Sequence, residues 1–189
     1  MLLVKKFNKF VVKILQMELK EFTIPFVGLK EGKHNFSFAI ENKFFQYFGF
    51  DDFHKTELEG KLTLDKKASF FELHFDVRGN VLLSCDVSTE LFNHAVKTNF
   101  DMIVKFGTPS DNDPDEILMI PEGSYQINVA QHFYEMVVLS LPLKRVHPGI
   151  KNGTLKNDIL SKLEQLDPQN RKSATHKDPR WEKLNSLLQ

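Results

Sequence analysis

The sequence has very little cysteine and no long apolar run. Its 189 residues include a single Cys, Cys85, so the chain cannot form an internal disulfide. A helix that crosses a bilayer needs roughly 20 consecutive apolar residues, and no segment approaches that length. One Cys and no spanning segment are typical of a protein in a reducing compartment. We therefore expect a cytoplasmic protein without a membrane span.

A set of catalytic or metal-binding residues is also missing. The sequence contains no Gly-rich phosphate loop and no nucleophile elbow. Its seven His are scattered, whereas a zinc site needs several N or S ligands. Cys85 is expected to be a small core residue, and Asp51-Asp52, a conceivable metal or acid–base pair, is better explained as a turn after a short helix. We therefore expect no enzyme activity and no cofactor.

One acidic segment, GTPSDNDPDE at residues 107–116, invites a calcium hypothesis. The calcium-binding loop requires Gly at its sixth position and Glu at its twelfth. Counted from Asp111, the sixth position is Glu116 and the twelfth is Glu122. Because only one of the two requirements is met, we interpret the segment as a flexible polar loop.

Charge is balanced over the whole chain but not along it. Residues 1–16 carry four Lys and no acidic residue, residues 17–143 carry 11 basic and 20 acidic residues, and residues 144–189 carry ten basic and five acidic residues. The central part is thus acidic and the C-terminal part basic. An acidic body does not attract phosphate backbones through its general field. Any contact with nucleic acid is therefore expected in the C-terminal part or at a local patch.

Three regions are expected along the chain. Residues 1–16 are basic and amphipathic without a cleavage site, which makes a poor targeting peptide, although a helix on a membrane surface is conceivable. Met17 resembles a natural domain start, so we interpret residues 1–16 as a doubtful N-terminal extension. Residues 17–150 form a Phe-rich α+β domain, and residues 151–189 form a basic tail with short helices.

Alternating apolar and polar residues predict the strands of this domain. Gly79-Asn80 interrupts one long alternation and is interpreted as a bulge or bend between two strands. The predicted strands are 20–27, with Pro25 at a sheet edge, 34–40, 57–65, 71–77, 81–87 and 94–106. A short helix or turn is predicted at 42–50, the main helix at 128–141 with Asn128 as its cap, and a further short helix at 156–166. The fold class is α+β: an antiparallel sheet or partly open barrel of about six strands, packed by one main helix, with a helical C-terminal tail.

The last residues contain the only Trp of the chain. Asp178 and Pro179 suit the cap and first position of a helix. Trp181, Leu184 and Leu188 then share one face of that helix. This short apolar ridge is expected to dock on its own domain or on a partner.

Three segments together resemble the YceD family, the large ribosomal RNA subunit accumulation proteins of bacteria and plastids. The first is an apolar strand leading to Cys85-Asp-Val-Ser88, where family members commonly show C-x-x-C. The second is the helix from Val129 that ends at Leu141-Pro142, and the third is Asp178-Pro-Arg-Trp181. Because Ser88 replaces the second cysteine, a lone thiolate remains, which cannot hold zinc as a pair could. A metal or redox role is therefore not expected for this chain.

The resemblance implies a non-enzymatic ribosome-biogenesis factor that promotes accumulation or processing of large-subunit ribosomal RNA. The alternative is a protein-interaction adaptor that binds a ribosomal protein or an assembly factor without direct RNA contact. The oligomeric state stays open. Basic residues of the tail would contact phosphates, and Trp181 would fill a protein pocket or, less expectedly, stack on a base. The candidate residues for binding RNA or a partner are Lys144, Arg145, Arg171, Lys172, Lys177, Arg180 and Trp181, with Lys151 as a further cation.

Overall fold

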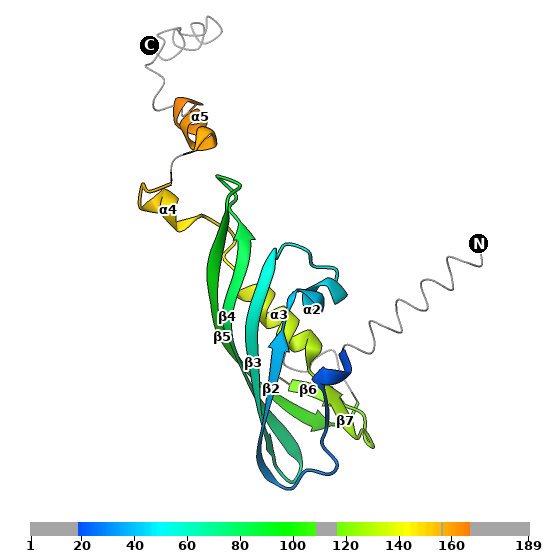
Figure 1. Cartoon of the computed structure of the whole chain (residues 1–189). Coiled ribbons are helices and arrows are strands. Elements are labelled where there is room, and N and C mark those ends of the chain that lie inside the picture. The colour runs from blue at the N-terminus through cyan, green and yellow to red at the C-terminus, as the bar shows by residue number, and fades with distance from the viewer. Residues whose placement is uncertain (1–18, 109–116, 156, 167–189) are drawn as a thin grey trace, which may run out of the picture.

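A computed structural model describes residues 19–108, 117–155 and 157–166 of the chain. Within these ranges the chain forms a twisted open sheet with one long helix across its inner face, as Figure 1 shows. The elements are η1 (Leu19–Phe22), β1 (Thr23–Pro25), β2 (Gly32–Ile40), α2 (Asn42–Tyr47), β3 (Lys55–Lys66), β4 (Phe70–Ser84), β5 (Leu91–Phe106), β6 (Ile117–Ile120), β7 (Gln126–Asn128), α3 (Ala130–Ser140), α4 (Pro148–Lys151) and α5 (Asp158–Leu166).

The main sheet has the strand order β2-β3-β4-β5-β6. The first three pairings are antiparallel, and the last, between β5 and β6, is parallel. The short strands β1 and β7 form a separate antiparallel pair, in which Ile24 lies opposite Ile127. The predicted α+β class is confirmed. The sheet stays open, so it forms no barrel, and it is mixed because of the one parallel pairing.

Period-two alternation predicted the central strands because one face of the sheet is buried. On β3, for example, Leu58, Leu62 and Leu64 are buried while their neighbours face solvent. The same pattern holds along β2 and β5. Phe44 and Phe45 of α2 are buried at one end of the core, as expected for the short helix at 42–50.

The prediction of two strands around Gly79-Asn80 is wrong, because β4 runs unbroken from Phe70 to Ser84. Its registers with β3 and β5 continue through Gly79 without an inserted residue, so there is no bulge. Gly79 has φ +149°, and a Cβ built there would lie 2.1 Å from the carbonyl oxygen of Glu57. The glycine therefore permits close approach of two strand backbones and does not end a strand.

Two further boundaries differ from the sequence prediction. Residues 20–27 form a 3-10 turn and a three-residue strand, and this strand pairs with β7 and not with the main sheet. Asn128 closes β7, and α3 begins at Ala130, although the Asn128 side chain still accepts a hydrogen bond from the Ala130 N–H at 3.0 Å. Gln131, three residues after Asn128, does not complete a capping box with it and instead donates to Glu135.

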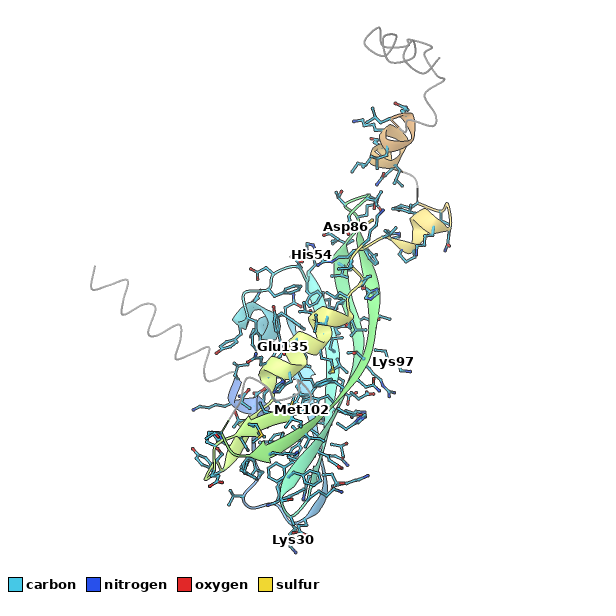
Figure 2. All side chains as sticks on the ribbon, turned by 180° about the vertical axis from the view of Figure 1, so that it is seen from behind. Lys30, His54, Asp86, Lys97, Met102 and Glu135 are labelled. Carbon is cyan, nitrogen blue, oxygen red and sulfur yellow. The ribbon has the colours of Figure 1, made fainter. Side chains whose placement is uncertain are left out.

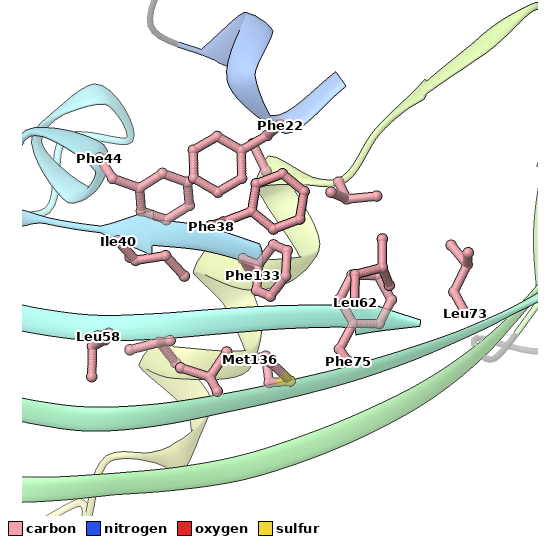
Figure 3. Packing of buried hydrophobic residues seen from close by; sticks show 14 of the residues in the cluster. Phe22, Phe38, Ile40, Phe44, Leu58, Leu62, Leu73, Phe75, Phe133 and Met136 are labelled. Atoms are coloured by element: carbon pink, nitrogen blue, oxygen red, sulfur yellow. The ribbon is translucent and has the colours of Figure 1, made fainter. Parts of the chain in front are cut away.

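Phenylalanine rings fill the space between α3 and the sheet. Phe133 of α3 is fully buried, and its ring lies 5.3 Å from that of Phe38 and 5.2 Å from that of Phe75. Phe22 stacks on Phe38 at 5.0 Å and contacts Phe44 at 4.8 Å. Figure 3 shows these rings, which come from η1, β2, α2, β4 and α3, meeting in one place. One apolar cluster therefore holds the helix, the sheet and the N-terminal turn together.

Candidate functional site

The turn after β4 ties the sheet to the segment that leads into the C-terminal helices. The Asp86 N–H donates to the Arg145 carbonyl at 2.8 Å, and the Arg145 N–H donates to the Asp86 carboxylate at 2.6 Å. The Arg145 guanidinium pairs with Asp52 at 2.7 Å. The His147 N–H donates to the Cys85 sulfur at 3.2 Å. We call this set of contacts among Asp52, Cys85, Asp86 and residues 145–147 the clasp.

Cys85 is the centre of the clasp. It lies just beyond β4 and is 2% exposed, as expected for a small core residue. Its sulfur accepts N–H groups from Val87 and Ser88, both at 3.4 Å, besides the one from His147. Burial on its own raises the pKa of the thiol, but the Ser88 hydroxyl and the three N–H groups outweigh it, so the net pKa is lowered. The Ser88 hydroxyl has no partner at hydrogen-bonding geometry, so we attribute the lowered pKa of Cys85 to the three N–H groups and not to this hydroxyl.

The donor set around Cys85 does not fit a metal ion. Cys85 is the one thiol of the chain, and its sulfur is already surrounded by N–H donors. Within the residues that the structure describes, no three His, Cys, Asp or Glu side chains converge as ligands. The sulfur therefore serves as a hydrogen-bond acceptor that joins the sheet to the C-terminal segment.

Two of the candidate binding residues lie in the described part of the chain. Lys144 is exposed next to the clasp. Arg145 is half-buried, and its guanidinium is committed to Asp52, so less of its charge is available to a phosphate. Lys151 ends α4 and is exposed. The remaining candidates lie outside the described residues: Arg171, Lys172, Lys177, Arg180 and Trp181. The acidic segment at 109–116 and the extension at 1–16 lie outside them as well.

The helix predicted at 156–166 is present as α5, and it is preceded by α4. Asn157 links α5 to the clasp region, because its amide donates to Glu90 at 2.9 Å while its oxygen accepts the Leu160 N–H at the start of the helix. Along α5 the apolar side chains of Ile159, Leu163 and Leu166 remain 40–61% exposed. The helix therefore presents an apolar face to solvent.

The outer face of the sheet carries charges of both signs. His74 pairs with Asp101 across β4 and β5, Lys61 lies 3.4 Å from Glu59, and Arg78 contacts Asp76 at 2.8 Å. His74 is exposed there, as its position in the alternation predicted. Between β2 and β5 this face has no row of aromatic side chains on which bases could stack.

A groove between α3 and β5 was not predicted from the sequence. It has a volume of about 510 Å³ and is lined by Thr98, Asn99, Phe100, Met102, His132, Glu135, Met136, Leu139 and Ser140. Leu139 on its rim is 83% exposed. Burial lowers the pKa of His132, and the nearby Glu135 opposes that shift. Figure 2 labels Glu135 of α3 and Met102 of β5, which both line the groove, and Lys97 of β5, which does not. The alternation in β5 indicated the strand but not which helix would lie beside it.

Together these features define an α+β protein with an open mixed sheet, one covering helix and a C-terminal segment clasped to the tip of the sheet. None of the described helices is both long and apolar enough to cross a membrane. A family model described as large ribosomal RNA subunit accumulation protein YceD matches residues 73–188. Since this match spans more than half of the chain, the protein belongs to the YceD family. No curated protein and no solved structure matches the chain.

The matched range begins inside β4 and ends one residue before the C-terminus. It contains both sides of the groove and every clasp residue except Asp52. The strands β2 and β3, which complete the sheet, lie outside the match. The part of the chain that the family model recognises is therefore the part that carries the clasp, the groove and the basic tail.

Proposed function

We propose that this protein is a non-enzymatic assembly factor that promotes accumulation or processing of large-subunit ribosomal RNA. The observation that carries the proposal is the family match over residues 73–188, which contains both sides of the groove, the basic tail and every clasp residue except Asp52. The protein acts by binding other macromolecules. The burial of Cys85 supports this view, because a thiol that is only 2% exposed is out of reach of a substrate.

In this proposal the basic C-terminal part makes the RNA contact. Residues 144–189 carry ten basic against five acidic residues, whereas residues 17–143 carry 11 against 20. The mixed charges on the outer face of the sheet favour the same division of roles, since that face offers neither a positive field nor a stacking surface. Lys144 lies where the body passes into this basic part.

The test is salt-dependent binding of the full chain to a large-subunit ribosomal RNA fragment. Each phosphate contact contributes a slope of about −0.9 in log affinity against log salt on B-form DNA and about −0.7 on single strands, and we expect RNA to fall in this range. A variant with Arg171, Lys172 and Lys177 changed to Gln is expected to lower the slope by about two to three. The matched control changes Lys33, Lys61 and Lys97 on the sheet to Gln, which removes the same charge and should leave the slope nearly unchanged. Equal losses in both variants would count against tail contact.

The exposed apolar face of α5 favours the second candidate, a protein adaptor without direct RNA contact. An amphipathic helix with a free apolar face is a common docking element for a protein groove. A pull-down from lysate with and without nuclease separates the two candidates. If large-subunit precursors are lost on nuclease treatment while a ribosomal protein is retained, the adaptor is the better description.

A further inference from the structure

The strand β5 has a long side without a neighbouring strand in the described residues. On one side, β4 pairs with β5 from Leu91 to Lys105. On the other side, β6 pairs only with Ile103–Phe106. Apart from the bonds of these strand ladders, no other backbone–backbone hydrogen bond to Leu91–Met102 is present within the described part of the chain. Twelve residues of strand edge are therefore open to pairing.

The register fixes which residues present their backbone groups to this edge. Cys85 donates to the carbonyl of Glu90, which places this pair at a hydrogen-bonded position of the β4–β5 ladder. Every second residue from there, including Phe92, Val96 and Phe100, is therefore bonded to β4. The intervening residues turn their N–H and C=O groups to the free edge: Leu91, Asn93, Ala95, Lys97, Asn99 and Asp101.

The groove between α3 and β5 lies directly beside this edge. Phe100 and Met102 supply its floor from the strand, and Met136 and Leu139 supply its wall from the helix. A strand edge next to a helix and an apolar groove offers two kinds of contact to an extended peptide. The edge bonds the peptide backbone, and the groove holds every second side chain.

We propose that the β5 edge and the α3–β5 groove form a binding site for an extended, basic polypeptide segment of a partner protein, which adds as a strand next to β5. Charge supports a basic segment, because Glu135 is the one charged residue in the groove lining and the surrounding body is acidic. The chain's own tail fits less well, since Trp181, Leu184 and Leu188 have helical and not alternating spacing. This inference is independent of RNA contact by the tail, so either proposal can fail alone.

The probe is a nine-residue peptide of alternating Lys and Val, and its control is the same peptide with alternate backbone nitrogens methylated. Hydrogen exchange of the full chain is followed residue by residue. On adding the first peptide, the edge-facing amides of Asn93, Ala95, Lys97, Asn99 and Asp101 should slow by at least about tenfold, while the amides bonded to β4 change little. The methylated peptide should have no effect. Protection of both sets alike, or by both peptides alike, would overturn the proposal.

Matched variants separate the edge from the groove. Asn99→Pro removes an edge-facing N–H and should weaken peptide binding by about tenfold or more, whereas Asn99→Ala keeps the N–H and should bind normally. Leu139→Ser should weaken binding several-fold, and Leu143→Ser, an equal change at an exposed Leu outside the groove lining, should not. Unchanged affinity in both Asn99→Pro and Leu139→Ser would refute the site.

Two other occupants give distinct results. If the edge amides are already protected in the free full chain at every dilution, the chain's own tail occupies the site, and the partner proposal fails. If that protection disappears on dilution together with a dimer seen by sedimentation, a second copy occupies it, and the proposal fails as well.

Discussion

Replacing Cys85 by Ala should destabilise the protein although no disulfide or metal is lost. The change removes the sulfur that accepts the N–H groups of Val87, Ser88 and His147. A buried donor left without a partner costs about 1–3 kcal/mol, and sulfur is a weak acceptor, so each loss lies near the lower end of that range. Three such losses add up to about 3 kcal/mol, which corresponds to a fall in Tm of roughly 6–12 °C for a chain of this length.

Two further variants test the cause. Cys85→Ser keeps a hydrogen-bond acceptor, the hydroxyl oxygen, but on a shorter bond than the sulfur. It should therefore lose about half as much stability as Cys85→Ala. Ser88→Ala removes a hydroxyl that is 1% exposed and has no hydrogen-bond partner, so it should stay within about 0.5 kcal/mol of the parent. Because the three N–H donors to the sulfur remain in Ser88→Ala, the pKa of the thiol should stay lowered, which thiolate absorbance would report.

The assay is urea unfolding followed by far-ultraviolet circular dichroism, which reports on the sheet and helices directly. Hydrogen exchange at the His147 amide adds a local measurement, since this N–H is bonded to the sulfur. The reasoning is refuted if Cys85→Ala unfolds within about 0.5 kcal/mol of the parent and His147 keeps its protection.

Three other predictions concern the core and its pH dependence. Gly79→Ala should lower the free energy of unfolding by at least about 3 kcal/mol, measured in urea, because its Cβ would meet the Glu57 carbonyl at 2.1 Å; an equal result for Gly123→Ala, which has open space at its Cβ, would contradict this cause. Phe133→Ala should cost about 3–5 kcal/mol, since a fully buried ring is removed from the aromatic cluster; a loss below about 1 kcal/mol would be inconsistent with that packing. His132 has a folded-state pKa below its ordinary value of 6.5. Its contribution to the free energy of unfolding is therefore fully present above pH 6.5, and the free energy of unfolding decreases as the pH falls below that value. His132→Gln should flatten the dependence of Tm on pH in that range.

The parts of the fold that were predicted from sequence are those with a local cause. The alternation in β3 and β5 follows from burial on one face, and the helix stop at Leu141-Pro142 follows from proline chemistry. Gly79 was misinterpreted because glycine often ends a strand. The apolar residues kept their odd-numbered phase on both sides of it, and this unbroken phase was the available signal for one strand.

The clasp and the groove could not be predicted, because their contacts join distant segments. Asp52 and Arg145 are 93 residues apart, and Cys85 and His147 are 62 residues apart. The Cys85-Asp-Val-Ser88 motif marked the right turn, but nothing in it indicated that a backbone N–H from beyond the main helix would reach the sulfur. Likewise, the free edge of β5 follows from the shortness of β6, which depends on the pairing of the whole sheet.

The length of the β4–β5 hairpin sets the separation between the two ends of the molecule. The fifteen residues of β4 extend over about 50 Å at about 3.3 Å per residue. Figure 1 shows α4 beside the tip of this hairpin and α5 past it, while η1 and β7 lie toward its other end. A contact made at one end of the hairpin is therefore separated from a contact made at its other end by most of this length.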